Sequence, residues 1–172
     1  MPSNIFFPMS DEGYRITEDL DDYELTLGHK FCAFYNSTVS GTAGTSVVSI
    51  TPNGSKICYA WFSIEVDKAG LYELYEDSEV SGGTIIVGIN NNRNSTLDSD
   101  CVVRSDPTVT TAGSFIGAHI IGSVTGGASK SGGSSSVNKY QLKQSTSYIV
   151  RFTADSDNTR ATQGIYWREV DA

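Results

Sequence analysis

Alternation of apolar and polar residues, with a period of two, constrains the fold of this chain more than any other feature of its sequence. In residues 59–67 (YAWFSIEVD), Phe62, Ile64 and Val66 share one face of an extended chain, and mostly polar residues follow on the other. Such alternation is typical of a β-strand with one buried face. Comparable segments occur at 71–76, 84–87, 114–121, 147–154 and 164–170, with weaker ones at 31–35 and 46–50. The sequence therefore predicts an all-β chain of roughly eight to ten short strands.

This pattern predicts a single antiparallel β-sandwich, jelly-roll-like, over residues 23–172. A chain of 172 residues is long enough to bury the core of one such domain. The short glycine-containing link at 68–70 predicts that the segments 59–67 and 71–76 form a hairpin. The residues expected in the core include Phe62, Ile64, Val66, Val150 and Phe152.

Two segments lack the strand period. Residues 1–22 are interpreted as an extended N-terminal arm that ends in an acidic stretch, and residues 122–136 as a flexible glycine- and serine-rich loop. The arm is expected to be either disordered or ordered by lying on a neighbouring molecule, and its apolar residues favour the second arrangement. These apolar residues are Ile5, Phe6, Phe7 and Met9.

The charge balance disfavours nucleic acid as a direct partner. The chain has 20 acidic and 12 basic residues, a net charge of −8, and no cluster of Lys and Arg that would follow a phosphate backbone. No apolar run approaches the roughly 20 residues of a membrane span, so no membrane partner is expected. The N-terminus also lacks the basic region and long apolar core of a signal peptide. We therefore expect a soluble protein that is not exported by that route.

The three cysteines, Cys32, Cys58 and Cys101, are widely spaced and form no C-x-x-C pair. Each lies in or beside an apolar segment, where a free thiol packs like a small hydrophobic group. Three buried free thiols are the favoured prediction, because they suit assembly in a reducing cytoplasm. One disulfide with one free thiol stays open as the alternative.

Patterns that carry chemistry are scarce. The two histidines have no H-x-x-x-H partner, and His119 lies within an apolar strand, where a structural histidine is favoured over a catalyst. No G-x-S-x-G motif occurs, and residues 41–46 are better explained as a turn that enters a strand. Residues 127–132 have the composition of a phosphate-binding loop but not its spacing.

Acidic residues form small groups of two kinds. Residues 98–100 and 155–158 offer oxygen ligands for calcium but lack the glycine and distal glutamate of an EF-hand loop. Pairs such as Glu73 with Glu76, or Glu65 with Asp67, have the residue types of a glycosidase site, although solvated strand faces are the default interpretation. We therefore expect no enzyme activity, no metal site and no cofactor.

The loop at residues 88–96 (GINNNRNST) combines four asparagines with one arginine. Asparagine and glycine allow the chain to leave a strand, since they tolerate left-handed backbone angles. An arginine fork in such a loop is expected to bond backbone carbonyls or a carboxylate and to make a rigid corner. Bracing of its own domain is the favoured role for Arg93, and contact of Asn92 and Arg93 with a partner is the other.

In the order of its segments, the chain from about residue 23 onward resembles a family of small virion proteins of tailed bacteriophages that are often encoded beside the major capsid protein. The N-terminal arm departs from the family pattern by its length. The features that carry the resemblance are a strand ending in a TP turn (50–54), a v.l.E strand (71–76), an N.NR loop (90–93), a d.tvT..G segment (106–113), the glycine-rich loop (122–136), an L...t.Y.vr.T strand (142–153) and an aromatic l.W.E strand (165–169).

The resemblance implies a non-enzymatic capsid decoration or cement protein that binds the outer surface of the capsid. Its implied partners are the major capsid protein and other copies of itself, with a trimer as one arrangement to test. It implies no catalytic residues. The candidate contact residues are Ile5, Phe6, Phe7, Met9, Asn92 and Arg93.

A carbohydrate-binding β-sandwich, as on a phage adhesin, is the alternative of a different class, and a glycoside hydrolase is a distant third. Aromatic side chains are the platform that sugar-binding sites use, although core faces explain most of them equally well. The residues available for such a platform are Tyr59, Trp61, Tyr72, Tyr75, Tyr166 and Trp167.

Overall fold

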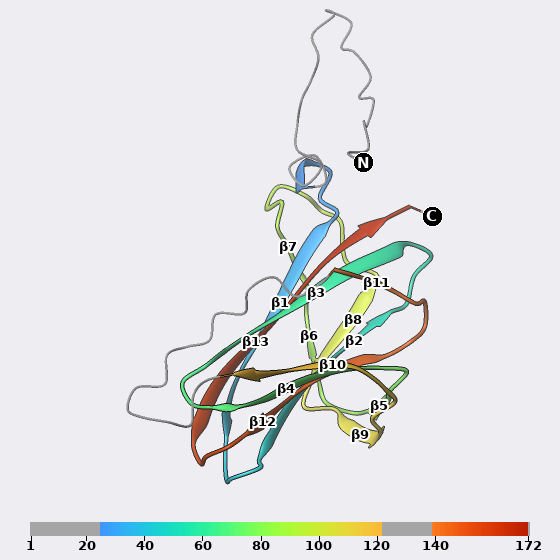
Figure 1. The fold of residues 1–172 in the computed structure, drawn as a ribbon. Coiled ribbons are helices and arrows are strands. Elements are labelled where there is room, and N and C mark those ends of the chain that lie inside the picture. The colour runs from blue at the N-terminus through green and yellow to red at the C-terminus, as the bar shows by residue number, and fades with distance from the viewer. Residues whose placement is uncertain (1–24, 122–138, 172) are drawn as a thin grey trace, which may run out of the picture.

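The computed structural model describes residues 25–121 and 139–171, and these residues form an antiparallel β-sandwich (Figure 1). The first sheet has five strands, in the order β11 (Tyr140–Leu142), β3 (Ile57–Val66), β13 (Thr159–Val170), β1 (Lys30–Val39) and β7 (Ile89–Asn90). The second has six, in the order β10 (Ser114–Ile121), β4 (Gly70–Glu76), β12 (Tyr148–Ala154), β2 (Thr45–Pro52), β8 (Cys101–Ser105) and β6 (Thr84–Ile86). Two further strands, β5 (Glu79–Ser81) and β9 (Thr108–Thr111), pair with each other.

The predicted all-β sandwich is confirmed, but the predicted hairpin between 59–67 and 71–76 is wrong. β3 belongs to the five-stranded sheet and β4 to the six-stranded sheet, so the link between them crosses from one sheet to the other. Alternation of apolar and polar residues shows only that a strand has one buried face. The same alternation occurs in two strands that pair within one sheet and in two strands that cover the core from opposite sheets. Gly70 begins β4 directly against the ring of Phe152, a position too close for any side chain.

Consecutive strands alternate between the sheets at both ends of the chain. β1, β2, β3 and β4 fall in the two sheets by turns, and β10 to β13 do the same. The later strands lie between or beside the earlier ones, as β13 does between β1 and β3, and β12 between β2 and β4. This alternation agrees with a jelly-roll connection, which stays a prediction.

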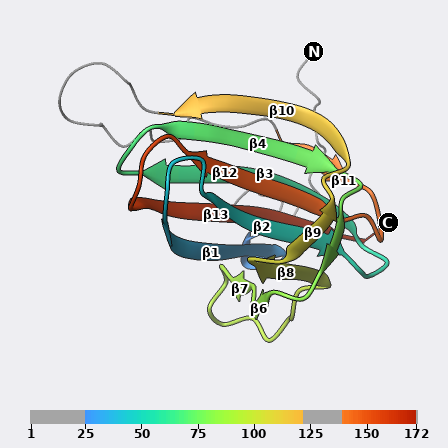
Figure 2. The same cartoon turned by 90° about the horizontal axis from the view of Figure 1, so that it is seen from below.

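Residues 77–113, between β4 and β10, extend one edge of the sandwich. They contain β5 to β9, of which β7 pairs with β1, while β8 pairs with β2 and β6 with β8. Figure 2 shows β6, β7 and β8 along this edge and β10 at the opposite one. The loop that contains Arg93 is therefore part of an added edge and not of the central strands.

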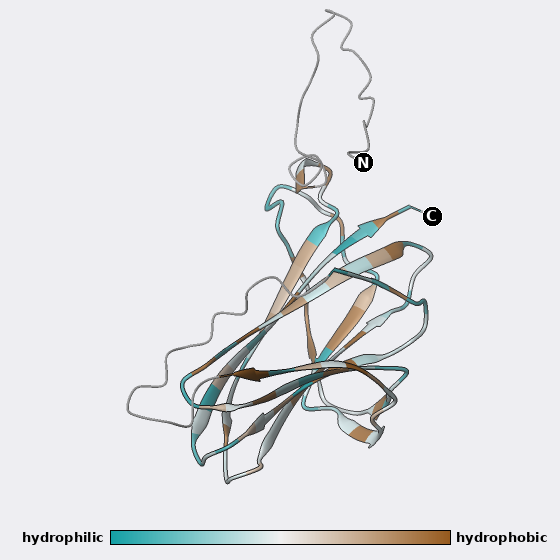
Figure 3. Ribbon diagram, viewed as in Figure 1, coloured by the Kyte–Doolittle hydropathy of each residue, from teal (hydrophilic) through white to brown (hydrophobic). Residues whose placement is uncertain are grey.

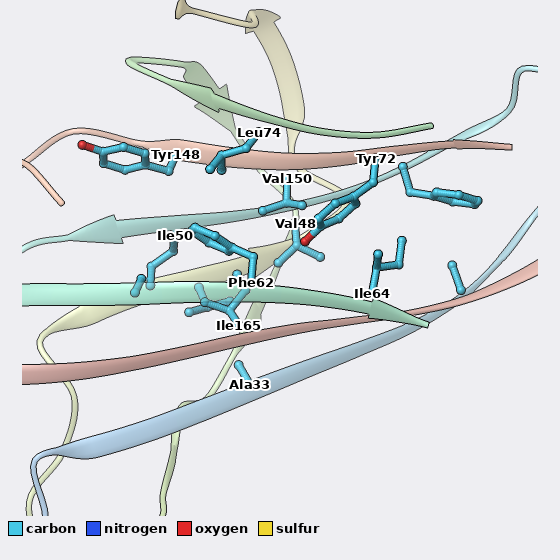
Figure 4. Close-up of a cluster of buried hydrophobic side chains, with 14 of the residues drawn as sticks. Ala33, Val48, Ile50, Phe62, Ile64, Tyr72, Leu74, Tyr148, Val150 and Ile165 are labelled. Atoms are coloured by element: carbon cyan, nitrogen blue, oxygen red, sulfur yellow. The ribbon is translucent and has the colours of Figure 1, made fainter. Parts of the chain in front are cut away.

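The core lies between the two sheets (Figure 4). All five residues expected there, from Phe62 to Phe152, are at most 4% exposed, so this prediction is confirmed. The indole of Trp167 is fully buried and stacks on Phe31, with ring centroids 5.8 Å apart. Burial of large side chains such as these contributes on the order of 1.5–3 kcal/mol each.

Candidate partner-binding surface

An extended segment, residues 84–90, carries the chain around the edge of the sandwich from β6 to β7, and we call it the edge segment. Its run of β-branched residues favours an extended backbone. Ile86 points inward and packs against the core, and Ile85 points outward opposite Arg104 of β8. At the other end Ile89 pairs with Cys32 on the outer face of β1.

Three apolar side chains alternate along the outward side of the edge segment, and we call them the apolar stripe. Ile85 is 58% exposed, Val87 79% and Ile89 45%. Leu97, in the loop that follows, is 45% exposed. Figure 3 shows apolar residues gathered on this part of the ribbon. Among the described residues, these four are half of the large hydrophobic side chains that are exposed, and such clustering marks interaction sites in soluble proteins.

Gly88 fixes the path of the edge segment over the core. A Cβ atom at this position would lie 2.7 Å from Cζ2 of Trp167, so only glycine lets the backbone approach the indole this closely. The stripe is consequently held out toward solvent by a large buried ring behind it. This makes the apolar stripe a fixed feature of the surface.

Asparagine amides supply most of the hydrogen bonds of the loop that follows β7. Asn90 Nδ2 donates to the carbonyls of Gly28 (2.8 Å) and Leu97 (3.1 Å), and its Oδ1 accepts from the amide of Asn92. Asn92 Nδ2 donates to the carbonyl of Thr26 (2.9 Å). These bonds attach the loop to the start of the described chain, so a sequence of polar residues forms a fixed corner.

Arg93 contributes less to this corner than the sequence suggests. It does donate to a backbone carbonyl, as expected, but through Nη1 alone and at 3.5 Å to Asn90. Its side chain is exposed, and within the described residues the guanidinium makes no second hydrogen bond and no ion pair with a carboxylate. Its charge reaches Cys32, where burial raises the pKa of the thiol and the nearby guanidinium opposes that rise.

Glu169 of β13 binds the other end of the same loop, at residues 99–101. This carboxylate is 1% exposed and accepts from Ser99 Oγ (2.5 Å), from the backbone amides of Asp100 (3.0 Å) and Cys101 (3.3 Å), and from Trp167 Nε1 (2.9 Å). Burial by itself would raise the pKa of Glu169, but these hydrogen bonds outweigh it and lower the pKa. The carboxylate is therefore charged at neutral pH and serves as a structural acceptor.

Aromatic side chains form a row across the outer face of the five-stranded sheet. The rings of Trp61 and Tyr166 are stacked, with centroids 5.7 Å apart, and Phe34 meets Tyr166 edge-on at 5.5 Å. Lys139, which precedes the neighbouring strand β11, places its Nζ 5.3 Å from the centroid of Trp61. Trp61 is thus engaged from both sides by protein groups, which disfavours its use as an open platform for a sugar ring.

The other aromatic residues of the carbohydrate hypothesis are dispersed. Trp167 and Tyr72 are buried in the core. Tyr75 is on the outer face of the other sheet, under the guanidinium of Arg151 at 4.8 Å. Tyr59 is likewise covered by Arg168 at 4.8 Å. The structure therefore does not gather these six residues into one site.

Three of the four carboxylates considered for glycosidase chemistry take part in structural bonds. Glu73 accepts two hydrogen bonds from Arg151 (2.9 and 3.0 Å), and Glu76 pairs with Lys143 (2.5 Å) and accepts from Tyr148 (2.8 Å). The bond from Lys143 is the main reason that the pKa of Glu76 is lowered. Asp67 accepts from the backbone amide of Arg160. Three of the four carboxylates thus take part in structural contacts, while Glu65 is exposed on β3.

Two further expectations from the sequence concern the acidic residues that could bind a metal and the histidine at position 119. Residues 99–101 donate hydrogen bonds to the Glu169 carboxylate, and Asp157 accepts from the amides of Gly41 and Asn158. Within residues 25–121 and 139–171 no three His, Cys, Asp or Glu side chains are grouped as metal ligands. His119 lies on β10, an edge strand, and is exposed there, and its structural role stays a prediction.

Four of the candidate contact residues, Ile5, Phe6, Phe7 and Met9, lie in the segment 1–22 and outside the described residues. Asn92 and Arg93 are described, and both lie at the edge that carries the apolar stripe. The stripe itself was not singled out from the sequence. Within the described part of the chain, no helix is long and apolar enough to cross a membrane.

Comparisons with known proteins give no relative: no family model, no curated protein and no solved structure matches this chain.

Proposed function

We propose that this protein is a non-enzymatic structural protein of a tailed-bacteriophage virion that decorates the outer surface of the capsid. The observation that carries the proposal is the apolar stripe of Ile85, Val87 and Ile89, exposed and held in place at one edge of the sandwich. Exposure of an apolar surface of this kind is unfavourable in a protein without a partner. Its burial is favourable when the protein binds a protein surface. The order of sequence motifs supplies the class of partner.

The partners in this proposal are the major capsid protein and other copies of this chain, arranged on the shell after synthesis in the host cytoplasm. A rigid edge is suited to docking, because little conformational entropy is lost when it binds. The loop of Asn92 and Arg93 lies beside the stripe, and its polar groups are suited to the rim of such an interface. No step of this role requires a catalytic group or a cofactor.

The structure favours docking on protein over binding of carbohydrate. A sugar-binding platform needs a free aromatic face, whereas Tyr166 and Lys139 contact the ring of Trp61 and Arg168 lies over one face of Tyr59. The stripe, by contrast, is aliphatic. Aliphatic side chains bury well against another protein but do not stack on sugar rings.

The test is binding to empty shells assembled from the major capsid protein that is encoded beside the gene for this chain. Two double variants are compared with the natural protein by co-sedimentation: Ile85→Asp with Val87→Asp, and Phe115→Asp with Ile120→Asp. The second pair is the matched control, since Phe115 and Ile120 are 58% and 82% exposed on β10 at the opposite edge.

We expect the stripe variant to bind the shells at least about tenfold more weakly, because charges would be buried in an apolar contact, and the β10 variant to bind unchanged. Equal binding by the natural protein and the stripe variant would contradict the assigned surface. Absence of any shell binding, together with selective binding on a glycan array, would support the carbohydrate-binding module instead.

A further inference from the structure

Two cysteines from different sheets face each other inside the sandwich. Cys58 of β3 and Cys101 of β8 are both unbonded, and their sulfur atoms are 3.4 Å apart, with the Cys101 thiol donating to Cys58. β3 lies in the five-stranded sheet and β8 in the six-stranded sheet. The contact therefore spans the core, between residues separated by 43 positions in the sequence.

The third cysteine cannot join this pair without unfolding. Cys32 is on β1 of the five-stranded sheet, where it pairs with Tyr166 and Ile89, and it points to the outer face. Cys58 is on the same sheet but points inward, and it is 1% exposed. Successive positions of a strand point to opposite sides of a sheet, so the body of the sheet separates these two thiols.

We propose that Cys58 and Cys101 are the site of an oxidative modification, a disulfide bond that joins the two sheets when the protein meets an oxidant. The sulfurs need to approach by about 1.4 Å, from 3.4 Å to the roughly 2.05 Å of a disulfide bond, which rotation of the side chains can supply. The bond would tie the added edge strand β8 directly to the central strand β3. Cys32 stays a free thiol.

Formation of the bond requires a two-electron oxidant, and a small uncharged diazenedicarboxamide is a suitable class. A thiolate adds to one nitrogen of its N=N bond, and the second thiol attacks the resulting sulfur–nitrogen bond. The products are the disulfide and a hydrazine, which has taken up the two hydrogens of the thiols. Cys101 is the point of entry, because its side chain is partly exposed while Cys58 is enclosed.

The reaction is expected to be slow at neutral pH. Two effects raise the pKa of the Cys101 thiol: the hydrogen bond with Cys58, which is the larger, and burial. Little of the reactive thiolate is therefore present at neutral pH. The rate should rise as the pH increases. If the protein is a virion component, as proposed above, release from a reducing cytoplasm would expose the pair to oxidising conditions.

The full-length protein, natively folded, is treated with diamide and examined by intact mass, by peptide mapping and by thermal unfolding. We expect the loss of two hydrogens, one crosslinked peptide pair that joins residues 58 and 101, and a melting temperature higher by roughly 4–16 °C, reversed by a reductant. The rise in melting temperature follows because the bond closes a long loop in the unfolded chain. Capsids take no part in this test, so its outcome is separate from that of shell binding.

Substitutions identify the pair. Cys32→Ser should keep both the mass change and the shift in melting temperature, whereas Cys101→Ser and Cys58→Ala should each lose them. A folded protein that keeps three free thiols throughout diamide treatment would overturn the proposal. So would a crosslink through Cys32, within one chain or between two.

Discussion

Trp167 and Glu169, two residues apart on β13, both face the interior, and Trp167 Nε1 donates a hydrogen bond of 2.9 Å to the Glu169 carboxylate. The same carboxylate binds the backbone amides of Asp100 and Cys101. The indole of Trp167 also lies directly against the backbone at Gly88. One central strand thus contacts the added edge on both sides of the asparagine-rich loop, through the Glu169 carboxylate at residues 99–101 and through the Trp167 ring at Gly88.

Replacing Glu169 by glutamine should destabilise the protein by about 3 kcal/mol. The amide has nearly the same shape, but it removes a charged acceptor and presents a donor to other donors, which leaves buried N–H groups without partners. Chemical denaturation measures the loss. Glu65→Gln is the control, because Glu65 is exposed on β3 and its substitution should change stability by no more than about 0.5 kcal/mol.

The same carboxylate predicts a loss of stability in acid. Since the pKa of Glu169 is lowered in the folded protein, the stabilisation is complete above the unfolded value of about 4.3 and disappears as the pH falls through the folded value. The free energy of unfolding of the natural protein should therefore decrease below about pH 4 more steeply than that of Glu169→Gln. Parallel pH profiles of the two proteins would show that Glu169 is not the responsible group.

Several features of the fold could be predicted from sequence because they depend on local alternation. The segments 114–121 and 147–154 are strands almost to the residue, and Val150 and Phe152 are in the core. The partner of a strand is set by contacts distant in sequence, so the hairpin of β3 and β4 was predicted wrongly. The short strand β8 was missed for a related reason: its pairing with β2 is its main support.

The candidate surface also combines features that local sequence predicts with features that depend on distant contacts. Turn chemistry correctly marked the loop of Asn92, since asparagine amides bond to nearby backbone. The run 84–87 resembled other apolar strands, and nothing local in it distinguishes an exposed edge from a buried one. The role of Glu169 also depends on residues about 70 positions away, so it could not be read from the l.W.E motif.

Phe152 tests the core. Its side chain is fully buried, so Phe152→Ala should lower the free energy of unfolding by about 3–5 kcal/mol through lost burial and a residual cavity. Phe115→Ala is the matched substitution at an exposed phenylalanine, where the cost should be below about 1 kcal/mol. Equal costs in denaturant titrations would mean that Phe152 is not buried as described.

The asparagine loop offers a contrast between two adjacent residues. Asn92→Ala removes the bond to Thr26 and the acceptor for the amide of Asn94, so amide hydrogen exchange in residues 90–97 should become at least about tenfold faster. Arg93→Ala removes one bond of 3.5 Å and should leave exchange within about twofold of the natural protein. Faster exchange in the arginine variant than in the asparagine variant would reverse the assignment of the bracing role.

Gly88 tests whether the indole of Trp167 holds the edge segment in place. A methyl group added by Gly88→Ala would lie 2.7 Å from the ring, so either the segment 84–90 shifts outward or the indole moves within a packed core. Such overpacking typically costs about 1–3 kcal/mol, and movement of the indole should also change the fluorescence of Trp167. Gly117→Ala is the control, since a Cβ atom there meets nothing within 4 Å and should be neutral or slightly stabilising. If the two alanine variants had the same stability and the same fluorescence as the natural protein, the edge segment would not rest on Trp167, and the rigidity of the apolar stripe would lose its physical basis.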